Sequence, residues 1–307
     1  MKTIFFTKNY KPHNWDIAHL YEHIVIANLE DTLAKKGFVP DIDFFIFANT
    51  FSGHLIKLSF VFYDDNTISV FKESLKNLQP PEDVQITAAI KEVEAEDACR
   101  INFEIDALKD ALNKLYNNDW QKTSNFKDPQ DADHENLDYY KFIPALENFN
   151  GLRIKIKLPK TAYGQNDENL AIFTRLSVIL ADTISRELRK KTYAYCKMSD
   201  TLQEKESTTV TAGYLISKTF SKKEVLKLAR ESITQKKLHP KYKQIKNHIA
   251  VWAKNYKHGF DKDKIIELLN SRTLDLLLSS IKIDVSLSKP TQDEIKRWRE
   301  INSDQSE

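Results

Sequence analysis

Two histidines and a glutamate lie close together near the N-terminus, in the sequence AHLYEH at residues 18–23. His19 and His23 are four residues apart, so on a helix both imidazoles lie on one face and can bind one metal ion. Glu22 precedes the second histidine, where a carboxylate can take a proton from a metal-bound water as a general base. The spacing HxxEH is the inverted zincin motif, the reverse of HExxH. It predicts a catalytic Zn²⁺ site, and the alternative is two helix histidines that bind no ion.

A third ligand is expected, because zinc bound by two histidines is usually completed by a carboxylate. A single helix predicted from about residue 81 to 116 supplies the candidates. At 100° per residue, Glu104, Asp97 and Glu94 fall within its apolar stripe, whereas Glu92 and Glu96 point to the opposite, solvated side. A carboxylate on a buried face is costly unless something compensates its charge, and a zinc ion would do so.

We favour Glu104 as the third ligand and Asp97 as an outer acid that orients a histidine. Asp97 or Glu94 as the ligand remains open. The alternative for each of these acids is a salt bridge, for example with Arg100.

The elements that position these residues follow from hydrophobic periodicity. The first half of the chain predicts a short strand at residues 2–6, a helix at 14–36, strands at 43–50 and 54–63 joined as a hairpin, and a helix at 67–78, followed by the long helix. The second half predicts a strand at 151–160, a helix at 168–191, strands at 194–201 and 208–217, and helices at 221–233, 240–255 and 291–302.

Both halves therefore have the same order of elements, at an offset of about 150 residues. We predict an α+β fold made of two similar units, 1–118 and 151–307. The segment 119–150, rich in Asn and Asp, is predicted to be a linker.

Composition excludes several classes of function. The net charge is only +2, and lysine-rich and acidic stretches alternate along the chain without a dominant basic face. This argues against nucleic acid as a partner. None of the six glycines forms a phosphate-binding loop. The only two cysteines, Cys99 and Cys196, have no metal or redox spacing. With no transmembrane or secretory segment in the pattern, we expect a cytoplasmic protein without a membrane partner.

The sequence Ala18–His23 after a strand resembles the pitrilysin/insulinase family of zinc peptidases. The resemblance implies His19 and His23 as zinc ligands and Glu22 as the catalytic base. The family's third ligand is a glutamate preceded by another acid seven residues earlier, which DACRINFEI matches with Asp97 and Glu104. Asp16 departs from the family pattern, which commonly has glycine two residues before the motif.

Two further segments resemble the family. FANTFS corresponds to its substrate-binding edge strand, which implies Ala48 and Asn49 as substrate contacts, although Phe47 stands where the family has asparagine. SRELRKKTYAY resembles its arginine–tyrosine segment, which implies that Arg189 and Tyr195 contact a substrate carbonyl. Their alternative is a helix end, with the arginine solvated and the tyrosine in the core.

The resemblance implies a zinc endopeptidase for short or unfolded peptides, acting as a homodimer or with a paired family subunit. A non-catalytic member that binds peptides or acts as a scaffold is the alternative. The corresponding helix of the second half contains no histidine, so the layout persists there without the motif. The presence of all three residues of HxxEH favours the enzyme.

Overall fold

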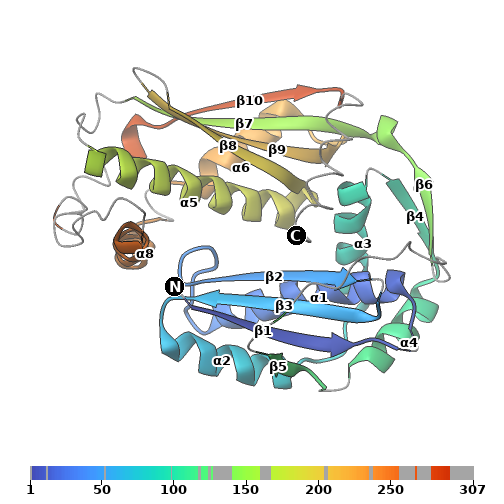
Figure 1. Cartoon of the computed structure of the whole chain (residues 1–307). Coiled ribbons are helices and arrows are strands. Elements are labelled where there is room, and N and C mark those ends of the chain that lie inside the picture. The colour runs from blue at the N-terminus through green and yellow to red at the C-terminus, as the bar shows by residue number, and fades with distance from the viewer. Residues whose placement is uncertain are drawn as a thin grey trace. The chain divides into compact units, whose positions relative to one another are not determined.

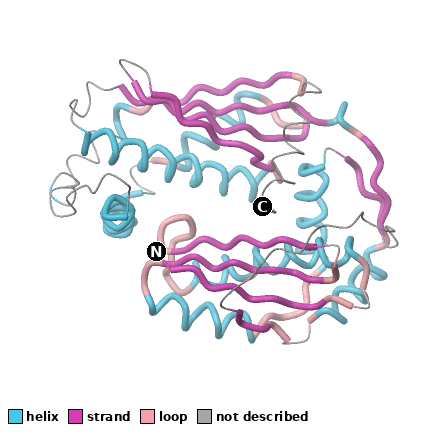
Figure 2. Tube along the Cα trace, in the orientation of Figure 1, coloured by secondary structure: helices cyan, strands magenta, loops and turns pink. Residues whose placement is uncertain are grey.

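The computed structural model describes residues 2–11, 13–51, 53–97, 99–116, 119–123, 126, 140–159, 167–203, 207–234, 238–255, 267 and 278–290. It divides the chain into two compact units, of which the first ends at Ala145 and the second begins at Leu146. Each unit combines helices with an antiparallel sheet, so the predicted α+β class is confirmed (Figures 1 and 2).

The first unit contains an antiparallel sheet of four strands in the order β2-β3-β1-β5. A separate ribbon pairs β4 with β6. Two of these strands, β5 and β6, lie in the segment predicted to be a linker, so that segment is partly structured. The elements in chain order are β1 (Lys2–Asn9), α1 (Trp15–Lys35), β2 (Phe44–Phe51), β3 (Leu55–Phe62), α2 (Asp65–Lys76), α3 (Asp83–Asp97), β4 (Cys99–Phe103), α4 (Ile105–Leu115), β5 (Gln121–Thr123) and β6 (Tyr140–Pro144).

Helices α1 and α2 cover the same face of this sheet. The Phe6 ring on β1 lies 5.5 Å from that of Phe71 on α2, and on the same face of β1 the ammonium group of Lys8 lies over the ring of Tyr21 on α1. Helix α1 also packs against α3 and α4. Because it is enclosed on several sides, α1 buries the polar residues Glu22 and His23 together with its leucines and two of its three isoleucines.

The predicted hairpin is present as β2 and β3, paired antiparallel from Phe44↔Phe62 to Phe51↔Leu55. Its turn includes His54, whose φ of 62° is in the left-handed region. Strand β2 forms the end of the sheet next to β3. Among the described strands, it is therefore an edge that a further extended chain could join.

The single long helix predicted for residues 81–116 is wrong, because β4 interrupts it between α3 and α4. Residues 99–103 alternate, with Cys99 and Ile101 buried and Arg100 and Asn102 exposed, which is the pattern of a strand with one buried face. The Glu94 carboxylate accepts the backbone N–H of Ile101 at 2.9 Å and so links α3 to β4.

The second unit has a sheet in the order β10-β7-β9-β8. When β10, β7, β9 and β8 are matched with β5, β1, β3 and β2, the two sheets have the same strand order, which is the expected result of a duplication. The predicted final helix at 291–302 lies outside the described residues. The elements are β7 (Phe149–Pro159), α5 (Asp167–Thr192), β8 (Tyr195–Gln203), β9 (Ser207–Ser217), α6 (Lys222–Ser232), α8 (Tyr242–Asn255) and β10 (Lys282–Ser288).

Among the described helices, none has both the length and the apolar character that crossing a bilayer requires.

Candidate metal centre

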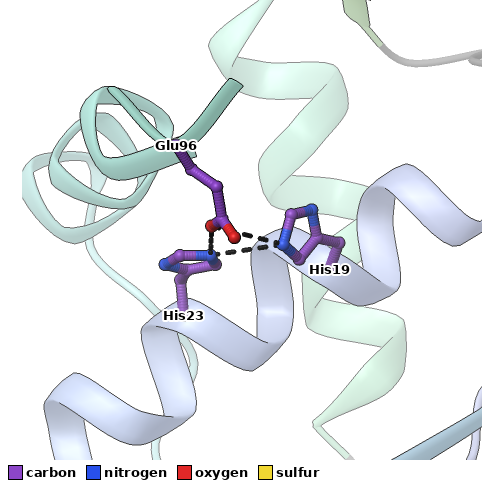
Figure 3. A group of neighbouring side chains, drawn as sticks. All are labelled: His19, His23 and Glu96. Carbon is purple, nitrogen blue, oxygen red and sulfur yellow. Dashed lines mark hydrogen bonds and ion pairs between the residues drawn. The ribbon is translucent and has the colours of Figure 1, made fainter. Parts of the chain in front are cut away.

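Helices α1 and α3 bring two imidazoles and one carboxylate together inside the first unit. His19 Nε2 and His23 Nε2 are 3.3 Å apart. Glu96 Oε2 lies 3.2 Å from the His23 nitrogen and 3.8 Å from the His19 nitrogen. Figure 3 shows the Glu96 carboxylate directed at both rings from the neighbouring helix. Among the described residues, this is the only group of three side chains that could hold a metal ion.

The spacing of these three donor atoms fits Zn²⁺. Ligands bound tetrahedrally at zinc's usual bond lengths lie about 3.3 Å from one another. The two nitrogens, 3.3 Å apart, and the 3.2 Å from Glu96 Oε2 to His23 Nε2 match this separation, and the 3.8 Å from Glu96 Oε2 to His19 Nε2 is about half an ångström longer. Two histidines and one carboxylate are also the protein ligands of many catalytic zinc sites, in which a fourth position remains for water or substrate.

Glu92 forms a hydrogen bond with Nδ1, the second ring nitrogen of His23. Its Oε2 lies 3.1 Å from His23 Nδ1, and the two side chains are 16% and 5% exposed. A carboxylate on the far nitrogen fixes the ring orientation and raises the basicity of the nitrogen that would face a metal. Burial opposes the charged imidazole, but the hydrogen bonds to Glu92 and Glu96 outweigh it and raise the pKa of His23 to about 9.

Glu22 is buried and lies outside the donor triangle. Its Oε2 accepts a hydrogen bond of 2.6 Å from Thr50 Oγ1 on the edge strand β2. The side chain that the motif predicts as a base is therefore tied to the strand that the sequence predicts as the substrate contact.

His19 is positioned by Trp15 as well as by the helix. The two rings lie 4.6 Å apart, and Trp15 Nε1 donates to the carbonyl oxygen of Thr50 at 3.2 Å. The first turn of α1 is thus joined to β2 beside the candidate site.

The structure places a different glutamate at the histidines from the one predicted. Glu104 is exposed at the residue before α4 begins and is not part of the cluster. Glu94 is buried, as predicted, but it accepts from Ile101 and pairs with Lys91. The side chain of Asp97 lies outside the described residues, so its outer-shell role stays a prediction.

Glu92 and Glu96, predicted to face solvent, instead face α1. They are one helical turn apart on α3, as His19 and His23 are on α1, and their side chains are 16% and 12% exposed. The prediction assumed that only the apolar stripe of α3 is packed. Two pairs of metal-ligating residue types, each at i and i+4 on separate helices, are the sequence signal that could have identified them.

The predicted substrate residues Ala48 and Asn49 lie on β2, on the strand that carries Thr50, and both are half-buried. Arg189 is near the end of α5 and is half-buried, while Tyr195 begins β8. Both belong to the second unit. The Tyr195 side chain lies outside the described residues, so the predicted joint role of these two residues stays a prediction.

No protein-family model and no curated protein matches this sequence. Similar solved structures include pitrilysin, at 11% identity and a TM-score of 0.25, with 99% of this chain and 46% of pitrilysin covered. A putative M16-like peptidase from Alicyclobacillus acidocaldarius shares 9% identity at a TM-score of 0.30, over 94% and 93% of the two chains. A predicted insulinase family protease from Yersinia pestis shares 11% identity at a TM-score of 0.27, with 99% of this chain and 91% of that chain covered. Likenesses this low do not assign the chain to a family, so its function is inferred below from the site itself.

Proposed function

We propose that this protein is a zinc-dependent endopeptidase that hydrolyses short or unfolded peptides. The observation that carries the proposal is the placement of His19 Nε2, His23 Nε2 and Glu96 Oε2 within 3.8 Å of one another, close to the separations of zinc ligands. Glu22, a candidate base, lies on the same helix and is bonded to the neighbouring edge strand. The three ligands and the base come from HxxEH and one later glutamate, which is the composition of a metallopeptidase centre.

The three ligands and Glu22 have separate tasks in this proposal. Zn²⁺ bound at the site would act as a Lewis acid on the scissile carbonyl and acidify the attacking water. Glu22 takes the proton of that water and returns it to the leaving amine, so that each peptide cleaved consumes one water. Glu92 keeps His23 oriented throughout.

The substrate is proposed to join β2 as an additional strand. β2 is an edge of the described sheet, and its half-buried residues Ala48 and Asn49 adjoin Thr50. Main-chain pairing along an edge supplies affinity that depends little on sequence, so selectivity among peptides should be modest. An extended segment is required, which favours unfolded chains over folded ones.

Arg189 and Tyr195 are proposed to stabilise the developing oxyanion from a facing subunit. A homodimer, or a pair with a related chain, is the assembly that this arrangement requires. The mass of the protein in solution tests it directly: a monomer at the concentrations used for activity contradicts this part of the proposal without touching the metal centre.

We expect the protein, purified without chelators, to contain about one zinc per chain, as three protein ligands define one site. Elemental analysis measures the metal, and a random mixture of internally quenched peptides measures cleavage. Chelation should abolish cleavage, and stoichiometric zinc should restore it. A protein that does not bind zinc even when zinc is supplied would contradict the proposal. The alternative, a non-catalytic protein that binds peptides or acts as a scaffold, would then remain.

Glu92→Gln is expected to weaken zinc binding by about 10–100-fold, the usual effect of losing an outer carboxylate partner. The amide keeps the size of the side chain but removes the charge that pairs with His23 Nδ1. Competition with a chromogenic chelator measures the affinity. Glu73→Gln is the control, since Glu73 is an exposed acid on α2 that pairs with Lys36. Equal affinities for both variants would show that Glu92 does not support the site.

A further inference from the structure

A second site is formed in the first unit, between α2 and the strands β1 and β5. A pocket of about 230 Å³ is lined there by three lysines and three apolar side chains. The lining residues are Phe6, Lys72, Leu75, Lys76, Trp120 and Lys122. None of the HxxEH residues or the proposed third ligand belongs to it.

The backbone places the three ammonium groups around one space. Lys72 and Lys76 are one turn apart on α2, so their side chains leave the helix on the same face. Lys122 on β5 pairs with Phe6 on β1, and residues directly opposite one another in a sheet project to the same face. That is the face on which Phe6 contacts α2.

No acid among the described residues balances these charges. The lining contains no carboxylate, and none of the three lysines forms an ion pair with any residue that the structure describes. The acids closest in sequence pair elsewhere: Glu73 lies 3.8 Å from Lys36, and Asp119 pairs with Lys8. Three like charges around a small cavity create a positive potential that an anion would relieve.

The apolar part of the pocket is fixed before any ligand arrives. The Trp120 ring stacks on Tyr21 of α1 at 6.4 Å with 17° between their planes, and Phe6 packs against Phe71. Rigid aromatic walls cost little to order on binding. They offer a flat apolar surface next to the cationic rim.

We propose that this pocket binds a small organic anion that carries a planar apolar group, such as an aromatic phosphate ester. The charged group interacts with Lys72, Lys76 and Lys122, and the planar group lies against Trp120 and Phe6. The site is independent of zinc and of peptide hydrolysis.

The test is calorimetric titration of the metal-free protein of all 307 residues with phenyl phosphate, so that no metal can hold the phosphate. We expect one phenyl phosphate per chain. Inorganic phosphate and phenol should each bind more weakly, because phosphate can interact only with the lysines and phenol only with the aromatic side chains. Lys72→Gln/Lys122→Gln should reduce the affinity for phenyl phosphate by at least about tenfold.

The matched control is Lys11→Gln/Lys35→Gln, which removes two exposed lysines of the same unit outside the pocket. Circular dichroism checks that both variants fold. The proposal is overturned if phenyl phosphate does not bind, if phenol binds as tightly, or if the two double variants lose the same affinity. Zinc content and peptide cleavage do not enter these outcomes, so this test and that of the proposed function fail separately.

Discussion

Replacement of Glu22 by Gln is expected to lower the rate of peptide cleavage by about 10²–10⁴-fold, the usual contribution of a positioned general base. The amide keeps the shape of the side chain and can still accept from Thr50 through its oxygen, so the packing of α1 should be retained. Gln cannot take a proton at neutral pH. Because Glu22 lies outside the donor triangle, the variant should keep about one zinc per chain.

The measurement is kcat/KM on the quenched-peptide mixture together with elemental analysis of the same sample. Glu30→Gln is the control on the same helix, eight residues further from the N-terminus. Cleavage at the wild-type rate in Glu22→Gln would remove Glu22 from the mechanism. Loss of zinc from this variant would contradict the placement of Glu22 outside the set of metal ligands.

Thr50 connects this base to the proposed substrate strand. The sequence singled out both HxxEH and the strand FANT, but their contact depends on how α1 packs on β2. Local patterns predict a helix and a strand separately; the hydrogen bond between Glu22 and Thr50 needs the tertiary arrangement. Hydrophobic periodicity therefore cannot predict that Glu22 and the edge strand β2 are in contact.

The first long helix and the hairpin after it were predicted closely. Helix α1 was expected at residues 14–36 and spans Trp15–Lys35, and the hairpin strands β2 and β3 begin and end within about a residue or two of their predicted bounds. Their bounds are distinct because turn residues stand where these elements end. Gly37, with a φ of 91°, follows α1 as a left-handed C-terminal residue.

The strand β4, missed in the sequence, explains why Glu104 was favoured over Glu96 as the third ligand. Apolar residues at 101, 105, 108 and 112 also match a helical period, so the strand was counted as part of a helix. Rotation at 100° per residue then carried Glu104 into the apparent buried stripe. With the helix ending at Asp97, that extrapolation has no meaning, and Glu104 is the exposed residue before α4.

The polar contacts between helices α1 and α3 were also not predicted from the sequence. A polar residue on an amphipathic helix is assigned to solvent by default. Glu92 and Glu96 instead face the histidines of α1, where opposite charges and ligating atoms meet in a partly enclosed space. Single-helix periodicity contains no information about the neighbour, and only the matching i and i+4 spacing on both helices indicates it.

Replacement of Glu96 by Gln is expected to weaken zinc binding by more than the roughly 10–100-fold loss that follows removal of an outer carboxylate. Glu96 supplies the only negative charge of the donor triangle, with its oxygen 3.2 Å from His23 Nε2. An amide oxygen is a weaker ligand for zinc than a carboxylate. The volume of the side chain is unchanged, so loss of metal should not reflect a packing defect.

Glu104→Gln makes the same chemical change at the residue that the sequence favoured as the ligand. Because Glu104 is exposed and caps nothing with its side chain, this variant should bind zinc and cleave peptides as the wild type does. Competition with a chromogenic chelator compares the two affinities, and thermal unfolding checks that both variants fold. The reverse result, with zinc lost from Glu104→Gln and kept by Glu96→Gln, would require α3, β4 and α4 to rearrange when metal binds. Equal zinc affinity in both variants would leave two histidines without a carboxylate partner, which is too few protein ligands for the catalytic centre proposed here.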